Sequence, residues 1–178
     1  MVGFMGAGKT TVGRMLGEQL GWRFEDLDDR IELRERRKVA AIFRDSGESS
    51  FRRAEHAALK ELLEELESGP EKIVALGGGA FAQDKNARLI QSAGVPTVFL
   101  EADADELWRR CSRQAEQDGI ERPLLKSLET FRELYEARRP HYMKATLRQN
   151  SGENTAAQIA KAVVLALGLS PKRRGETQ

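Results

Sequence analysis

Residues 3–10 read Gly-Phe-Met-Gly-Ala-Gly-Lys-Thr, a run whose residue types and spacing could hold a chain of phosphates. Its pattern, G-x-x-x-x-G-K-[ST], turns the backbone at glycine so that successive N–H groups point at phosphate oxygens. Lys9 would bring an ammonium group to the β- and γ-phosphates, and the hydroxyl of Thr10 suits Mg²⁺. We therefore interpret the run as a nucleoside triphosphate site, the alternative being a simple glycine-rich turn.

Asp26 and Asp28 stand two residues apart at the end of a segment that we expect to be extended. If the segment stays extended, both carboxylates leave on one face, which at the C-terminal edge of a parallel sheet opens onto a ligand crevice. One could hold Mg²⁺ together with Thr10, and the other could hold a substrate hydroxyl and accept its proton. The alternative is that one of them caps a following helix.

Arg52 and Glu55 lie three residues apart in an expected helix and so share a face. Arg52 could meet an anionic substrate while Glu55 orients it, or the two could form an ordinary surface ion pair. Three consecutive glycines at residues 77–79 suit a backbone that must approach a ligand closely, and the alternative is a flexible turn.

Two later arginines could also meet charged groups. Arg122 ends a polar stretch, and an arginine that swings in on a lid can neutralise a phosphoryl group in transfer. Arg138 lies in an expected helix and could hold a carboxylate with two hydrogen bonds. Each arginine, taken alone, could equally be a solvated surface residue.

Helical and extended patterns alternate along the chain, which predicts an α/β fold with a parallel sheet. Residues 114–122 are polar and are expected to form a mobile loop, and the charged end of the chain is expected to be disordered. The expected helices are residues 9–20, 28–36, 39–44, 50–67, 104–114, 128–142 and 155–167, and the expected strands are residues 22–26, 73–76, 95–100 and 145–149.

The composition limits what the chain can be. Its 178 residues, 40% of them hydrophobic, suit one domain, and 29 Lys and Arg against 28 Asp and Glu give no basic surface for nucleic acid. We expect no membrane segment and no secretory signal. The single cysteine, Cys111, fits a reducing cytoplasm, and with His56 and His141 it makes no zinc-type cluster.

The order of these motifs, together with Arg-Pro-Leu-Leu at residues 122–125 and Arg-x-Pro-x-Tyr at residues 138–142, resembles the shikimate kinase family from residue 3 to residue 167. The resemblance implies ATP-dependent phosphorylation of the 3-hydroxyl of shikimate, on the route to chorismate and aromatic amino acids. It implies a monomer with a three-layer P-loop kinase fold, in which helices flank a five-stranded parallel sheet of order 2-3-1-4-5. Residues 1–168 would form the domain, with a lid at about 112–124 and a tail at 169–178.

The resemblance also implies roles for single residues. Catalysis would depend on Lys9, Asp28 and Arg122, and Mg²⁺ would be served by Thr10 and Asp26. Shikimate would be bound by Asp28, Arg52, Gly78, Gly79 and Arg138. ATP would be held by Gly3, Gly6, Ala7, Gly8, Lys9, Thr10, Thr11, Arg110 and Arg122.

Two departures from the family pattern stand out. Only Met1 and Val2 precede the phosphate loop, so we expect the first strand to be truncated, and residues 149–154, where the family contacts adenine, lack its common proline. Two other functions therefore stay open. One is a related kinase of another small hydroxy acid such as gluconate, and the other is an inactive ATP-binding or regulatory module.

Overall fold

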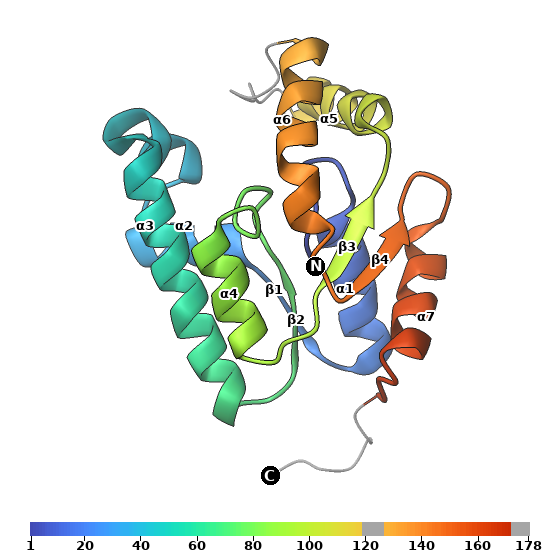
Figure 1. Cartoon of the computed structure of the whole chain (residues 1–178). Coiled ribbons are helices and arrows are strands. Elements are labelled where there is room, and N and C mark those ends of the chain that lie inside the picture. Colours follow the sequence, from blue (N-terminus) through green and yellow to red (C-terminus); the bar gives the residue numbers. More distant parts are fainter. Residues whose placement is uncertain (119–126, 172–178) are drawn as a thin grey trace.

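The computed structural model describes residues 1–118 and 127–171, in which helices cover both sides of a set of parallel strands (Figure 1). The strands are β1 (Arg23–Asp26), β2 (Lys72–Ala75), β3 (Val98–Glu101) and β4 (Leu147–Asn150). The helices are α1 (Lys9–Leu20), α2 (Leu27–Glu35), α3 (Val39–Ser68), α4 (Asp84–Ser92), α5 (Ala104–Asp118), α6 (Leu128–Tyr142) and α7 (Ala156–Ala166).

The strands form two separate parallel pairs rather than the predicted five-stranded sheet. β1 pairs with β2, and β3 pairs with β4. Only Met1 and Val2 lie between the pairs: the N–H of Leu76 donates to the carbonyl of Met1 at 3.0 Å, and the N–H of Val2 donates to that of Val98 at 2.8 Å. The described residues therefore do not confirm one continuous five-stranded sheet, because Met1 and Val2 make only a single β-bridge there, between Val2 and Phe99.

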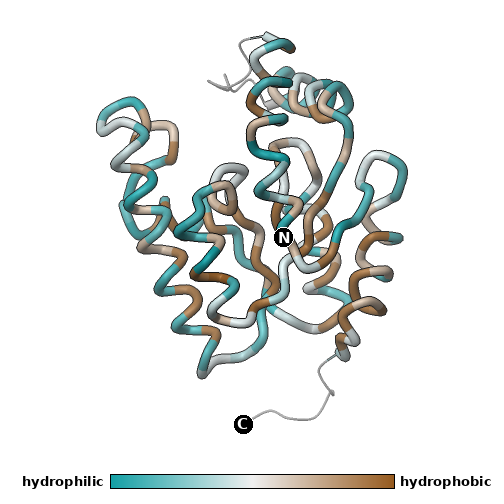
Figure 2. Tube along the Cα trace, viewed as in Figure 1, coloured by the Kyte–Doolittle hydropathy of each residue, from teal (hydrophilic) through white to brown (hydrophobic). Residues whose placement is uncertain are grey.

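Helix α1 begins directly after the phosphate loop and ends at Gly21, as the sequence predicts. Gly21 has φ 66°, a left-handed conformation that stops helices, and its N–H donates to the carbonyl of Gly17. The apolar side chains of α1 are buried at helical spacing, with Val12, Leu16 and Leu20 at most 2% exposed. The same inward bias is visible along α3, α4 and α7 (Figure 2). Burial of these faces holds the helices against the strands and so fixes the loops at the strand ends.

Residues 39–68 form α3, which consists of two helical segments joined at Gly47, in agreement with the two helices expected there. Gly47 has φ 77° and ψ 169°, outside the helical region, so the segment before it and the segment after it point in different directions. Glycine adopts this conformation without the strain that a side chain would bring. The break separates residues 39–46 from the long part of α3, which carries Arg52 and Glu55 and also pairs with α2 through Arg30–Glu65 and Arg34–Glu61.

Helix α4 was missed by the sequence analysis. It buries Asn86, Ala87 and Ile90, and its other positions are mostly polar, so too few apolar residues repeat to reveal a helix of this length. The available signal for the start of this helix was Asp84 in its first turn, where a carboxylate interacts favourably with the helix dipole.

Residues 114–118 of the expected loop are helical instead, because α5 continues to Asp118. Residues 112–118 of the expected lid are therefore helical, and residues 119–124 lie outside the described part of the chain. At the C-terminus, Leu169 still packs against the core, and its N–H donates to the carbonyl of Val164 at 3.0 Å, so this residue belongs to the folded part and not to the expected tail. Residues 172–178 also lie outside the described part.

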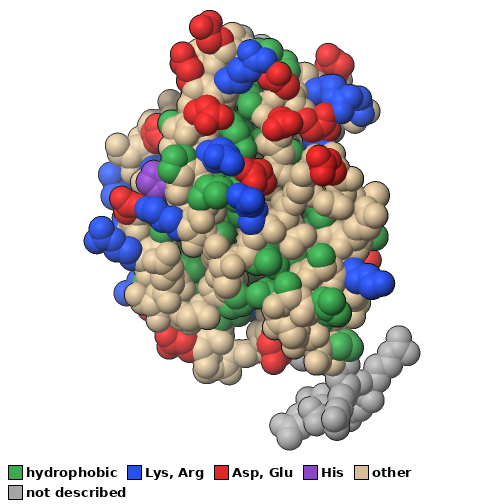
Figure 3. Space-filling model, turned by 45° about the vertical axis from the view of Figure 1, so that its right-hand side comes forward, with side chains coloured by type: hydrophobic (Ala, Val, Ile, Leu, Met, Phe, Trp, Pro, Cys, Tyr) green, Lys and Arg blue, Asp and Glu red, His purple; other side chains and the backbone are tan. Residues whose placement is uncertain are grey.

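Charged side chains on the outer surface are mostly mixed in sign. Figure 3 shows a face on which Lys and Arg lie beside Asp and Glu, and the ion pairs Arg109–Glu106, Arg132–Asp105 and Arg139–Glu101 are of this kind. None of the described helices combines the length and apolar character needed to cross a membrane.

Candidate active site

The backbone of the phosphate loop turns at three glycines with positive φ. Gly3, Gly6 and Gly8 have φ of 140°, 78° and 87°, values that residues with a Cβ rarely adopt. A Cβ at Gly6 would also lie 2.8 Å from the carbonyl oxygen of Leu107, so the loop packs directly on α5. The predicted loop is therefore confirmed in shape: conformation favours glycine at all three positions, and close contacts also require it at Gly3 and Gly6.

Lys9 curls back over this loop. Its Nζ donates to the carbonyl oxygens of Gly3 and Phe4, each at 3.0 Å. The ammonium group thus lies against the phosphate loop, where it could form charge-assisted hydrogen bonds with a bound phosphate. The loop and the N-terminus of α1 together favour an anion at this place.

A cavity of about 630 Å³ opens in front of the loop. It is lined on one side by the phosphate loop and the start of α1, and on the other by the ends of β1 and β2 and the start of α7. Its lining residues include Gly6, Ala7, Gly8, Lys9, Thr10, Thr11, Asp26, Asp28, Gly77, Gly78, Arg110, Gln114, Ser151 and Asn154. Ligand sites are expected where parallel strands end, and the cavity lies there.

Asp26 caps a helix, as one interpretation of the sequence expected, and it also contacts Thr10. One carboxylate oxygen accepts from the N–H of Asp28 at 3.0 Å and caps α2, and the other accepts from the hydroxyl of Thr10 at 3.2 Å. Thr10 and Asp26 thus offer adjacent oxygen atoms at the cavity wall, which are the donors that Mg²⁺ prefers. In the described part of the chain no group of three or more His, Cys, Asp or Glu could hold a metal, so further ligands would come from the nucleotide or water.

Among the carboxyl groups that line the cavity, that of Asp28 has the most strongly shifted pKa. Its Oδ1 is buried and has no hydrogen-bond partner among the described residues. Burial, followed by the negative charges of Asp26 and Glu55, raises the pKa of Asp28 to about 6. A Cβ at Gly77 would lie 2.6 Å from this Oδ1, so the glycine permits the close approach. A carboxylate with a raised pKa and a free acceptor atom can bind a hydroxyl and take up its proton.

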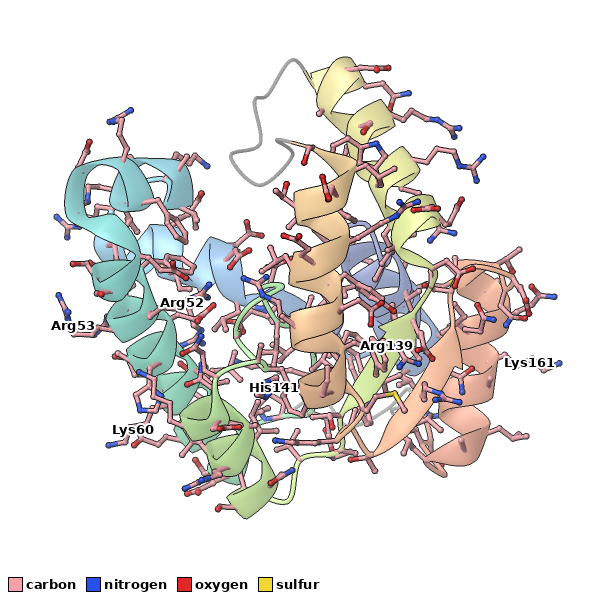
Figure 4. The ribbon with its side chains drawn as sticks, turned by 45° about the horizontal axis from the view of Figure 1, so that its top comes forward. Arg52, Arg53, Lys60, Arg139, His141 and Lys161 are labelled. Atoms are coloured by element: carbon pink, nitrogen blue, oxygen red, sulfur yellow. The ribbon has the colours of Figure 1, made fainter. Side chains whose placement is uncertain are left out.

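Arg52 and Glu55 form a buried pair, so the surface ion pair is ruled out. Glu55 is 1% exposed, and Nη1 of Arg52 donates to its two oxygens at 3.0 and 2.9 Å. Burial raises the pKa of Glu55, and the charges of Arg52 and Arg138 oppose that rise. In Figure 4 Arg52 lies on the inner side of α3 and Arg53 extends outward. Glu55 therefore fixes a guanidinium group that faces the inside of the molecule.

The glycines at residues 77–79 are the meeting point of these side chains. A Cβ at Gly79 would lie 2.6 Å from both Nη atoms of Arg52. The carbonyl of Gly78 accepts from Nη1 of Arg138 at 3.4 Å and from the hydroxyl of Tyr142. Arg138 also lies over the ring of Phe4 in the phosphate loop, 5.7 Å from its centre. The turn is thus held by side chains from α3 and α6, unlike the flexible turn that was the alternative.

Arg110 lies at the far end of the cavity. Its Nε donates to Glu106 at 2.7 Å and its Nη2 donates to the carbonyl of Ser151 at 2.8 Å. This ties α5 to the loop between β4 and α7, and Arg110 faces the same cavity as the phosphate loop. Arg122, predicted for the lid, lies outside the described residues.

Three polar side chains of the cavity and one contact were not predicted. Gln114, Ser151 and Asn154 line the cavity but were not assigned a role, although residues 149–154 had been marked as the adenine region. The contact of Tyr142 with the glycine turn was also missed, because only the spacing of the motif had been considered. No local sequence signal identifies which backbone groups such side chains reach.

Comparisons with known proteins identify a family. The family model described as Shikimate kinase matches residues 5–168. A shikimate kinase of Cereibacter sphaeroides is 43% identical over 174 residues, covering 96% of this chain and 82% of the relative.

Solved structures are also similar. The shikimate kinase of Aquifex aeolicus superposes with a TM-score of 0.78 at 34% identity, covering 94% of each chain. That of Acinetobacter baumannii, solved in complex with shikimate, has a TM-score of 0.78 at 33% identity and covers 94% of this chain and 90% of its own. With a fold of the P-loop kinase type and a family match along nearly its whole length, the chain belongs to the shikimate kinase family.

Proposed function

We propose that this enzyme transfers the γ-phosphoryl group of ATP to the 3-hydroxyl of shikimate and releases shikimate 3-phosphate and ADP. The observation that carries the proposal is the family match over residues 5–168. The convergence of Asp28, Arg52 and Arg138 on one glycine turn beside the phosphate loop supports it. The product would then continue toward chorismate and the aromatic amino acids.

The nucleotide side would be made by the phosphate loop. The N–H groups of residues 3–11 would hold the phosphates, with Lys9 neutralising charge on the group in transfer. Arg110 would lie near the adenine, and Arg122 would close over the phosphates from the lid. The support for Arg110 is its place in the cavity wall, held by Glu106 and Ser151.

The acceptor side would bind shikimate between its charged ends. Arg52 and Arg138 would hold the carboxylate, and Gly78 and Gly79 would lie against the ring. Asp28 would accept a hydrogen bond from the 3-hydroxyl and take its proton as that oxygen bonds to the γ-phosphorus and ADP leaves. The free Oδ1 of Asp28 and its pKa of about 6 support this role.

Thr10 and Asp26 would hold Mg²⁺, directly or through water. Their hydroxyl and carboxylate oxygens lie 3.2 Å apart at the cavity wall, and hard oxygen donors suit this cation. Bound there with the nucleotide, Mg²⁺ would supply neutralisation of the phosphate charge.

The wider architecture carries proposals of its own. We infer that residues 1–168 act as one domain with a lid between α5 and α6. We also infer that Met1 and Val2 are the central strand of a sheet of order 2-3-1-4-5, in which they count as strand 1 and β1 to β4 count as strands 2 to 5. Backbone bonds from Met1 to Leu76 and from Val2 to Val98 and Leu100 support that order. We also propose a monomer in the cytoplasm, in line with the single, buried Cys111.

A coupled assay of ADP release with shikimate and with gluconate tests the function. We expect turnover with shikimate and none above background with gluconate. Turnover with gluconate alone would point to the other kinase, and a folded protein that turns over neither would be the inactive module. Both outcomes would overturn the proposal.

A further inference from the structure

Helix α4 contains a fully buried polar side chain that has no role in the site described so far. Asn86 is 0% exposed. Its Nδ2 donates to the carbonyl oxygen of Ala80 at 3.1 Å, and its Oδ1 lies 2.6 Å from Nδ1 of His56. Because a buried amide is costly unless both of its ends are bonded, this side chain fits its two partners specifically.

The direction of these hydrogen bonds is fixed by the partners. Since the carbonyl of Ala80 can only accept, Nδ2 of Asn86 must face it, and Oδ1 must face His56. Nδ1 of His56 therefore carries a proton and donates it, whether the ring is neutral or charged. The link from α3 to α4 does not depend on the charge of His56.

On one side, this link reaches the helix that carries the arginine clamp. His56 follows Glu55 directly in α3, and Glu55 holds Arg52 with two hydrogen bonds. A shift of α3 against α4 would therefore move Arg52 with it.

On the other side, the link reaches the glycine turn. The N–H of Ala80 donates to the carbonyl of Gly77 at 3.0 Å and closes the turn, and the carbonyl of Ala80 is the atom that Asn86 holds. Gly77 lies against Asp28 and Gly79 lies against Arg52. Asn86 thus fixes the distance between α3 and the backbone that the shikimate-binding side chains contact.

We propose that Asn86, supported by His56, is a positioning residue for the acceptor side: it touches no substrate and acts through the turn at residues 77–80. The proposal rests on the proposed function, since shikimate must bind at that turn. A purely structural role for Asn86 would affect folding and both substrates alike. A positioning role would change the apparent affinity for shikimate and leave that for ATP nearly unchanged.

Asn86→Asp is the sharpest change. It keeps the shape of the side chain and an acceptor for His56, but it places a second acceptor against the carbonyl of Ala80. We expect the KM for shikimate to rise about tenfold, with the KM for ATP within about twofold of wild type. Arg88→Gln, an exposed change on the same helix, is the control and should leave both values unchanged.

A pair of changes at His56 tests the same link without altering α4. His56→Leu removes the donor and should raise the KM for shikimate by about threefold to tenfold. His56→Asn places an N–H close to the position of Nδ1 and should restore most of the lost affinity. The pair keeps the proposal testable if Asn86→Asp does not fold.

Steady-state kinetics of all four variants and the wild type, with melting temperatures, decide the outcome. A selective rise in the KM for shikimate, reversed in His56→Asn, supports the proposal. Unchanged kinetics in folded variants, or equal losses toward shikimate and ATP, overturn it. Failure of the wild type to turn over shikimate would instead overturn the proposed function, so the two failures are distinguishable.

Discussion

The phosphate-binding part of the site is made by consecutive residues, whereas the acceptor side is assembled from separate elements. The phosphate loop and the start of α1 lie within residues 3–11. Asp28, Arg52 and Arg138 come from α2, α3 and α6, and they meet at a turn that follows β2. The nucleotide side therefore depends on local backbone conformation, and the acceptor side depends on how the helices pack.

Because of this difference, substitutions on the two sides should have different kinetic effects. A change in the phosphate loop should impair transfer of the phosphoryl group whatever the concentration of shikimate. A change on the acceptor side that spares Asp28 should mainly raise the KM for shikimate. Substitutions confined to one side test whether these two effects are separable.

Asp28→Asn should have the largest effect, because it removes the proton acceptor at the reacting hydroxyl. We expect kcat to fall by about 100- to 10,000-fold. In the wild type, kcat/KM for shikimate should rise as pH increases through about 6, where Asp28 ionises. Asp29→Asn, the exposed neighbour, is the control. A pH profile that is flat from 5 to 7.5 would contradict the role of Asp28.

The same variant should be more stable than the wild type at pH 8. The pKa of Asp28 is raised by folding, so its ionisation costs stability as pH rises from about 4 to about 6, and that cost remains above this range. Removing the charge should recover about 1–3 kcal/mol of unfolding free energy. Urea unfolding at pH 8 measures this free energy. A loss of stability in the variant would show that burial does not destabilise the ionised form of Asp28.

Lys9→Ala should lower kcat by about 100- to 1000-fold, because the charge that stands over the phosphate loop is lost. The KM for shikimate should stay within about threefold of wild type. Lys60→Ala removes an exposed lysine on α3 and should be neutral (Figure 4). A large rise in the KM for shikimate in Lys9→Ala would show that the two sides are not separable.

Arg138→Ala should raise the KM for shikimate by about 10- to 100-fold and change the KM for ATP much less, since a charged hydrogen-bonding partner of the carboxylate is lost. Arg53→Ala removes a guanidinium on the outer side of α3 and serves as the control. Equal effects on both substrates would argue against a carboxylate clamp.

Gly79→Ala should give the smallest effect, a rise of about 3- to 10-fold in the KM for shikimate. The new Cβ would lie 2.6 Å from the guanidinium of Arg52, which must move away from its place in the site. The melting temperature should stay within about 2 °C of wild type, and an unchanged KM for shikimate in the folded variant would exclude this mechanism.

The same contrast explains what the sequence could predict. The phosphate loop and the bounds of α6 were predicted correctly, because glycine conformation and helical periodicity are local properties. The burial of Glu55 and the contact of Gly79 with Arg52 depend on α3 packing against the turn, which no local pattern encodes. Helix α4 was missed because its buried face includes a polar residue, Asn86, in place of an apolar one.

The most direct test of the central claim is the stoichiometry of the wild-type reaction with shikimate and MgATP. We predict one ADP formed for each shikimate consumed, with the product carrying a single phosphate on the 3-hydroxyl. A folded protein that forms no more ADP with shikimate than without it would contradict the claim that the acceptor side binds this substrate for phosphorylation.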